Sequence, residues 1–251
     1  MAQIGVSNHP HIPMKPTVVP HEINFVLDTQ QRNPMLANPK MLHYSGIVPE
    51  NWVFLHPPMF CNNLVRMTFA NGTGIVAQPN QIVFQEIINQ KPSSAVEIAD
   101  IASKYVKTMP NLGYQRMLIT IIGHVPYLNE PVAPLQYLHD KLLAPGEWME
   151  FGEAAVESSV TFRYQLLSSN LQLTVNHGTL RTPDEDIIPI VAFLAEFNHT
   201  INTDSTEETV ADIIQAINTW QFNLKIYTDL INNKFLASQS PKTRGFSLNR
   251  N

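Results

Sequence analysis

Residues 64–88 read LVRMTFANGTGIVAQPNQIVFQEII, and this stretch decides the fold. It contains three β-prone runs that are separated by two turn signals. Asn71-Gly72 is a strong hairpin signal, because both central positions of a type I′ turn need a positive φ. Pro79-Asn80 predicts a second turn. We therefore predict an antiparallel meander with strands at 64–70, 74–78 and 82–88.

The next segment supplies a helix and a central strand. Ser94 and Glu97 have the spacing of a capping box, in which each side chain satisfies a free amide at the helix start. Apolar residues then recur at helical spacing, so we expect a helix that continues to about Met109. Residues 114–125 are apolar on both faces near their middle, which predicts a strand at the centre of a covered sheet. A short strand at 23–27 and a short helix within 126–148 complete this half.

A second meander follows, and a long helix follows the meander. Ser205 and Glu208 repeat the capping-box spacing. Apolar residues then keep a 3.6-residue period to about Phe235. This pattern predicts an amphipathic helix of roughly 28 residues, or about 42 Å at 1.5 Å per residue. The strands of the meander are expected at 160–167, 171–176 and 188–201.

The order of these elements predicts an α+β protein with two antiparallel β-meanders, each followed by a helix, and a long C-terminal amphipathic helix. The two sheets could pack side by side or form one continuous sheet. Low residue identity between the halves leaves an internal duplication open. The predicted parts are an extended Pro-rich arm at 1–20, an N-terminal α+β half at 21–143, a C-terminal α+β half at 147–236 and an extended basic tail at 237–251.

Composition and charge limit the classes of partner. Hydrophobic residues make up 44% of the chain, enough for a core, and charged residues only 15%. A weakly charged surface repels itself less, which favours association. The net charge is −5 and the basic residues are dispersed, so we expect no nucleic-acid binding, which needs a basic stripe. The single cysteine, Cys61, forms no internal disulfide, and we expect it to be buried as a small hydrophobe.

The N-terminal residues lack the basic region and the following apolar region of a signal peptide. No apolar run approaches the ~20 residues that a membrane span requires. We therefore expect a cytoplasmic protein with no transmembrane segment.

No catalytic motif stands out. The phosphate-binding glycine loops, the serine nucleophile elbow and the His-Glu-x-x-His zinc motif are all missing. Glu196 and His199 have the spacing of a carboxylate–histidine metal motif, but they fall in a predicted strand, where i and i+3 point to opposite faces. We expect no cofactor and no metal, and we assign no catalytic residue. An enzyme whose site assembles from distant residues stays open.

Aromatic and basic residues outside the predicted core are the candidates for partner binding, because aromatic side chains dominate interface energetics. Phe222 falls off the apolar stripe of the last helix, whereas Trp220 falls on it and is expected in the core. The predicted partner-binding residues are Trp52, Phe54, Phe222, Lys242, Arg244 and Phe246.

We expect a non-enzymatic protein–protein interaction protein, a subunit or adaptor of a larger assembly, which binds a protein partner or associates with itself. Extended arms commonly become ordered on a partner. One alternative is a small-ligand-binding protein or unrecognised enzyme with a pocket under the Pro-rich segment 43–61, lined by His43, His56 and Cys61. Another is a chaperone-like module that binds a peptide along an uncovered sheet edge beside an apolar groove.

Two short motifs carry a family resemblance. Tyr105 with the run 110–114 (Pro-Asn-Leu-Gly-Tyr) precedes the central strand, and Leu230-Ile231 leads to Lys234-Phe235 at the end of the last helix. In these features residues 20–236 resemble a sporadically distributed, functionally uncharacterised bacterial family with two β-rich halves and a C-terminal amphipathic helix. The resemblance implies that fold and transfers no catalytic residue.

Overall fold

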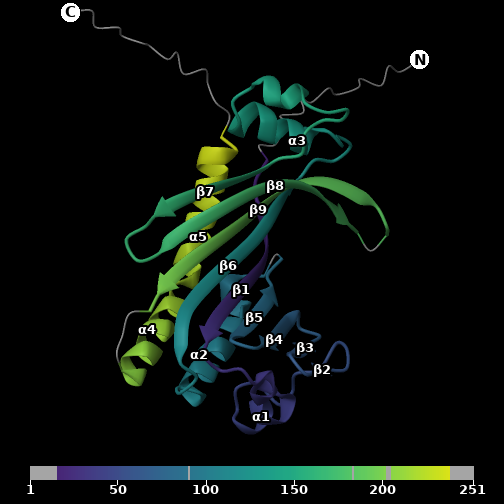
Figure 1. The fold of residues 1–251 in the computed structure, drawn as a ribbon. Helices are drawn as coiled ribbons and strands as arrows, with labels where there is room; N and C mark the ends of the chain where they lie inside the picture. Colours follow the sequence, from purple (N-terminus) through teal and green to yellow (C-terminus); the bar gives the residue numbers. More distant parts are fainter. Residues whose placement is uncertain (1–15, 90, 183, 202–204, 238–251) are drawn as a thin grey trace, which may run out of the picture.

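A computed structural model describes residues 16–89, 91–182, 184–201 and 205–237. Its core is one antiparallel sheet of nine strands in the order β2-β3-β4-β5-β1-β6-β9-β8-β7 (Figure 1). The sheet is therefore continuous, and the α+β class predicted from the sequence is confirmed. The strands are β1 (Val19–Thr29), β2 (Met59–Cys61), β3 (Leu64–Thr68), β4 (Thr73–Gln78), β5 (Gln81–Ile87), β6 (Tyr114–Pro126), β7 (Ser159–Gln165), β8 (Asn170–Arg181) and β9 (Ile187–Thr200).

The helices α2, α4 and α5 pack on one face of this sheet (Figure 1). α2 packs on β5 and on α4, while α4 and α5 pack on β6. The C-terminal helical region, predicted as one helix, is divided at Thr219 and ends in the π-helical turn η5. The helices are η1 (Pro34–Ala37), α1 (Pro39–Tyr44), η2 (Ser93–Ala95), α2 (Ile98–Thr108), α3 (Ala133–Tyr137), η3 (Leu138–Leu142), η4 (Glu147–Glu150), α4 (Thr206–Asn218), α5 (Trp220–Leu230) and η5 (Ile231–Phe235).

The centre of the sheet is the antiparallel pair of β1 and β6, which joins the two halves of the chain. Phe25 of β1 lies opposite Ile119 of β6, and both are fully buried under the helices. Their outer neighbours on the same face are Phe84 of β5 and Phe197 of β9, which are also fully buried. One row of buried side chains thus runs through the core across four strands.

The predicted hairpin at Asn71-Gly72 is present, but its turn type differs from the prediction. The Gly72 N–H donates to the Phe69 carbonyl, and the Phe69 N–H donates to the Thr73 carbonyl. Only Gly72 has a positive φ, of 85°, while Asn71 does not. The loop therefore has the three-residue form with glycine in the left-handed position. Asn71 instead accepts hydrogen bonds from the amide and the hydroxyl of Thr73.

The capping box predicted at Ser94 is wrong. The helix starts later, at Ile98, and Glu97 has no side-chain capping bond. The buried carboxylate of Glu86 on β5 takes that role, because it accepts the N–H groups of Glu97 and Ile98 at 2.9 Å each. At the second predicted capping site the Ser205 hydroxyl does accept the Glu208 amide at 3.1 Å, so that N-cap is confirmed.

The prediction that Cys61 is buried is also wrong. Cys61 ends β2, a strand of three residues that are all exposed. β2 pairs only with β3 and all three of its residues are exposed, so neither of its faces is covered by the described residues.

Candidate functional site

The strand β7 forms one edge of the sheet, and its outer side is open. Its residues pair with β8 only, and among the described residues no element pairs with the other side. The Leu166 N–H donates to the Ser169 carbonyl at 3.0 Å, which fixes the phase of the hydrogen-bond ladder. Because the ladder alternates, the backbone groups of Thr161, Arg163 and Gln165 point away from β8. They are free to pair with an added strand.

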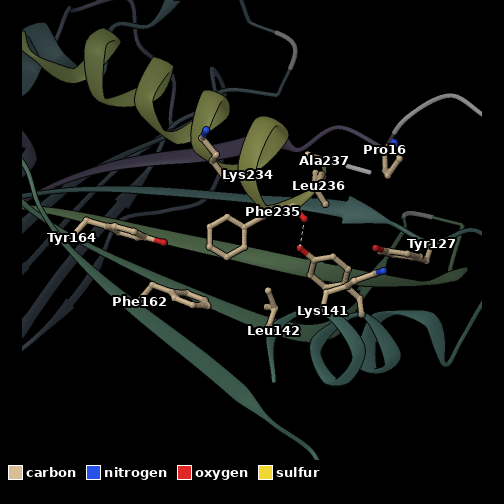
Figure 2. A pocket seen from close by; sticks show the side chains of 11 residues that line it. Pro16, Tyr127, Lys141, Leu142, Phe162, Tyr164, Lys234, Phe235, Leu236 and Ala237 are labelled. Atoms are coloured by element: carbon tan, nitrogen blue, oxygen red, sulfur yellow. Dashed lines mark hydrogen bonds between the residues drawn. The ribbon is translucent and has the colours of Figure 1, made fainter. Parts of the chain in front are cut away.

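A groove lined by aromatic side chains lies beside this edge (Figure 2). Its volume is about 650 Å³. Phe162 of β7 meets Phe235 of η5 edge to face, with ring centroids 5.1 Å apart. The Tyr137 hydroxyl donates to the Phe235 carbonyl at 3.0 Å and holds the end of the helix in place. The lining of this first groove is Pro16, Tyr127, Tyr137, Lys141, Leu142, Phe162, Tyr164, Lys234, Phe235, Leu236 and Ala237.

The charge of the first groove is positive. Lys141 and Lys234 are exposed at its rim, and neither forms an ion pair with any described residue. Burial raises the pKa of the Tyr127 and Tyr137 phenols, with a further increase at Tyr127 from the nearby Glu130 carboxylate. Both phenols therefore stay neutral at physiological pH. The groove combines apolar rings with two ammonium groups, which suits an apolar segment that carries an acidic residue.

A second groove, of about 680 Å³, lies where the β7–β8 hairpin approaches α5. Leu167 at the hairpin tip is fully exposed, and Phe222 on α5 is 62% exposed. Exposed apolar side chains that line one cavity together are typical of an interaction surface. The lining contains no charged residue and consists of Gln165, Leu166, Leu167, Ser168, Ser169, Phe222, Asn223 and Ile226.

The two grooves lie beside β7, the second at the start of α5 and the first at η5. Phe162, Tyr164 and Leu166 alternate along β7, so their side chains project from the same face. Phe222 lines the second groove and Phe235 the first, and thirteen residues of helix span about 20 Å at 1.5 Å per residue. One extended segment of about six residues, at 3.3 Å per residue, could therefore reach from one groove to the other.

The predicted partner-binding residues fall in three places. Phe222 lines the second groove, as an exposed side chain off the buried stripe. Trp52 and Phe54 are half-buried and contact Phe69, with ring centroids 5.0 and 4.9 Å away, so they fasten their own segment to the sheet. Trp220 is buried in the core as expected. Lys242, Arg244 and Phe246 lie outside the described residues.

The pocket proposed under residues 43–61 has no counterpart among the described cavities. None of them is lined by His43, His56 or Cys61. The ring of His43 instead meets Phe54 edge to face, with centroids 6.4 Å apart. η1 precedes this segment, and α1 ends inside it at Tyr44.

Sequence reasoning missed the residues of the first groove, since they come from four separate parts of the chain. For the part of the first groove that β7 forms, the sequence holds a local signal. There Val160, Phe162 and Tyr164 alternate with Thr161 and Arg163. This alternation predicts a strand with one apolar face. It does not show that the strand lies at an edge.

Comparison with known proteins adds no family to this geometry: no protein-family model and no curated protein matches the chain. In the part of the chain that the structure describes, no helix is long and apolar enough to cross a membrane. The same residues include no group of three or more His, Cys, Asp or Glu side chains placed to hold a metal ion.

Proposed function

We propose that this protein binds an extended segment of a partner polypeptide, which adds to the sheet as a strand beside β7. The observation that supports the proposal best is the open edge of β7 between two grooves. The outward N–H and C=O groups of Thr161, Arg163 and Gln165 give the hydrogen bonds of the added strand. This proposal joins the expected interaction protein to the peptide-binding alternative.

The grooves are needed for affinity as well as for selectivity. A main-chain hydrogen bond adds only about 0.5–1.5 kcal/mol net, because it replaces a bond to water. Strand addition alone would thus be weak and independent of sequence. A buried aromatic or aliphatic anchor adds about 1.5–3 kcal/mol, so one anchor in each groove makes binding selective for certain segments.

A partner-binding subunit or adaptor in the cytoplasm fits this site. The Cys61 thiol is free and exposed, which is compatible with a reducing compartment. No described residue completes the outer edge of β7, so the partner segment comes from outside the described chain. The sequence of the segment that binds therefore identifies the partner protein and its assembly.

The test is a selection of phage-displayed random 12-residue peptides on the purified protein, followed by affinity measurements on variants. Arg163→Pro removes one outward N–H, and a proline whose nitrogen faces solvent is tolerated in an edge strand. Arg163→Ala is the matched control, because it removes the same side chain and its bond to Gln172 but keeps the N–H. We expect selected peptides to bind the wild type and Arg163→Ala, and to bind Arg163→Pro at least tenfold more weakly.

Two results would contradict the proposal. The first is a selection that enriches no binding peptide. The second is equal affinity of the enriched peptides for Arg163→Pro and Arg163→Ala, which would place their site away from the edge of β7. Circular dichroism of both variants is the control for folding.

A further inference from the structure

At the opposite end of the sheet, an extended segment of the chain itself pairs with the outer side of β3. Residues 53–55 run antiparallel to the end of β3, and Phe54 pairs with Phe69. The Leu55 N–H donates to the Thr68 carbonyl, and the Ala70 N–H donates to the Val53 carbonyl, each at 2.8 Å. Trp52 and Phe54 turn inward onto Phe69, while Val53 and Leu55 are exposed. The segment therefore has the pattern aromatic-x-aromatic.

The topology makes β3 and β7 equivalent. In the first half β1 is central, and the consecutive strands β5, β4 and β3 follow outward from it. In the second half β6 is central, and β9, β8 and β7 follow outward in the same way. Helix α2 follows β5, and α4 follows β9. The two halves are thus repeats of one arrangement, with β3 and β7 as matching outer strands of their hairpins.

The hairpin turns align the two strands residue by residue. Phe69 donates its N–H across the first hairpin turn to Thr73, and Leu166 donates its N–H across the second to Ser169. Leu166 is therefore the counterpart of Phe69, and the neighbours Thr68 and Ala70 correspond to Gln165 and Leu167. These counterparts, Gln165, Leu166 and Leu167, line the second groove.

We infer that the second groove receives an aromatic-x-aromatic segment of a partner protein, bound antiparallel to β7 as residues 52–55 are bound to β3. This inference rests on the proposed function and specifies the chemistry of its ligand. The uncharged lining with Phe222 and Ile226 accepts the two rings. The Gln165 carbonyl and the Leu167 N–H take the places of the Thr68 carbonyl and the Ala70 N–H.

The antiparallel direction also predicts where along the ligand an acidic residue lies. A segment that starts at Leu167 runs back along β7 toward Phe162 and enters the first groove with its C-terminal part. From Leu166 to Phe162 it covers about four residues, or ~13 Å at 3.3 Å per residue. There it meets Lys141 and Lys234. An Asp or Glu about four residues after the aromatic pair complements these ammonium groups.

The chain's own tail, residues 238–251, suits the two grooves neither in charge nor in direction. Residues 238–251 contain Lys242, Arg244 and Arg250 and no acidic residue. The described chain ends at Ala237 in the lining of the first groove, so a tail extended from there toward the second groove would run parallel to β7. Charge and direction both favour an acidic segment of another protein.

Fluorescence anisotropy with a labelled synthetic peptide, Glu-Asn-Trp-Val-Phe-Leu-Ser-Ser-Glu-Glu, tests the inference on the full-length protein. Its first six residues copy residues 50–55. We expect saturable binding, about tenfold weaker when both aromatic residues of the peptide become Ser and when the final Glu-Glu becomes Lys-Lys. The loss on charge reversal should shrink in high salt, because the lysines are exposed.

Two protein variants test whether the peptide binds in the second groove. Phe222→Ser should weaken binding about tenfold. Ile187→Ser is the matched control, because Ile187 is 61% exposed against 62% for Phe222 and lies at the start of β9, outside both grooves. We expect the control to bind like the wild type.

The inference is overturned if the peptide does not bind, if the Ser-substituted peptide binds equally well, or if Phe222→Ser and Ile187→Ser bind alike. A protein lacking residues 238–251 that alone binds the peptide would show that the tail fills the groove, and would overturn it too. The proposed function fails separately, when no phage-selected peptide depends on the edge of β7.

Discussion

The carboxylate of Glu86 replaces a helix cap, and its removal should be among the most costly single changes in this protein. Glu86 is fully buried at the N-terminus of α2. One of its oxygens accepts the Glu97 and Ile98 amides at 2.9 Å, and the other lies 2.8 Å from the Lys91 ammonium. Lys91 in turn donates to the Asn71 carbonyl at 3.0 Å, so the cluster joins the first hairpin to the helix.

The cost of Glu86→Ala follows from these three bonds. Loss of an N-cap costs about 0.5–2 kcal/mol, and here two amides, of which that of Ile98 is buried, lose their acceptor. Removing one partner of a buried ion pair costs about 3–5 kcal/mol. Lys91 is partly exposed and recovers some hydration, so we expect a total loss of about 4 kcal/mol in the free energy of unfolding. Glu86→Gln keeps a carbonyl acceptor and should lose about half as much.

Urea denaturation monitored by circular dichroism measures this loss, with a thermal melt beside it. At about 2–4 °C per kcal/mol for a chain of this size, Glu86→Ala should melt roughly 8–16 °C below the wild type. Glu97→Ala is the control, because its exposed side chain bonds only to Asn71, and we expect a change within about 0.5 kcal/mol. A loss below about 1 kcal/mol for Glu86→Ala would refute the assignment of Glu86 as the cap.

Three further results are expected. A Cβ at Gly123 would lie 2.5 Å from the Tyr227 hydroxyl oxygen and 2.6 Å from a backbone carbonyl. Gly123→Ala should therefore lower the free energy of unfolding by about 2 kcal/mol, measured by urea denaturation. An unchanged midpoint would contradict this prediction. Burial lowers the pKa of His124 and of His199 below 6.5 in the folded state, so the unfolded chain takes up protons first. The free energy of unfolding should then fall as the pH drops below about 6.5, less steeply in His199→Gln, and a flat profile would argue against it. Cys61 should react with iodoacetamide in the native protein as fast as in urea, whereas slow labelling would contradict its exposure.

Local signals in the sequence predict several of the strands, but not the order of all nine in the sheet. The meander of residues 64–88 and the N-cap at Ser205 depend on turn and cap residues within a few positions. Period-2 alternation in β8 and 3.6-residue periodicity in α4 add the buried faces. These features need no distant partner, which is why the printed sequence shows them.

The remainder depends on contacts between distant residues. Glu86 displaces the local cap at Ser94 because the fold brings a strand carboxylate to the helix start. Cys61 is exposed because no described element covers either face of its strand, which its apolar neighbours do not indicate. The first groove combines Tyr127 with Phe162 and Phe235, and no local pattern relates them. Among the residues that line the two grooves, Phe222 alone was predicted from the sequence, by its place off the helical stripe.

Backbone amide exchange at β7, followed by NMR, tests strand addition most directly. In the free protein the N–H groups of Thr161, Arg163 and Gln165 face away from β8 and should exchange rapidly with solvent deuterium. With the aromatic-acidic peptide at saturation they should become protected, while the inward amides of Phe162 and Tyr164 change little. Peptide that saturates the protein and leaves the outward amides unprotected would contradict strand addition at β7.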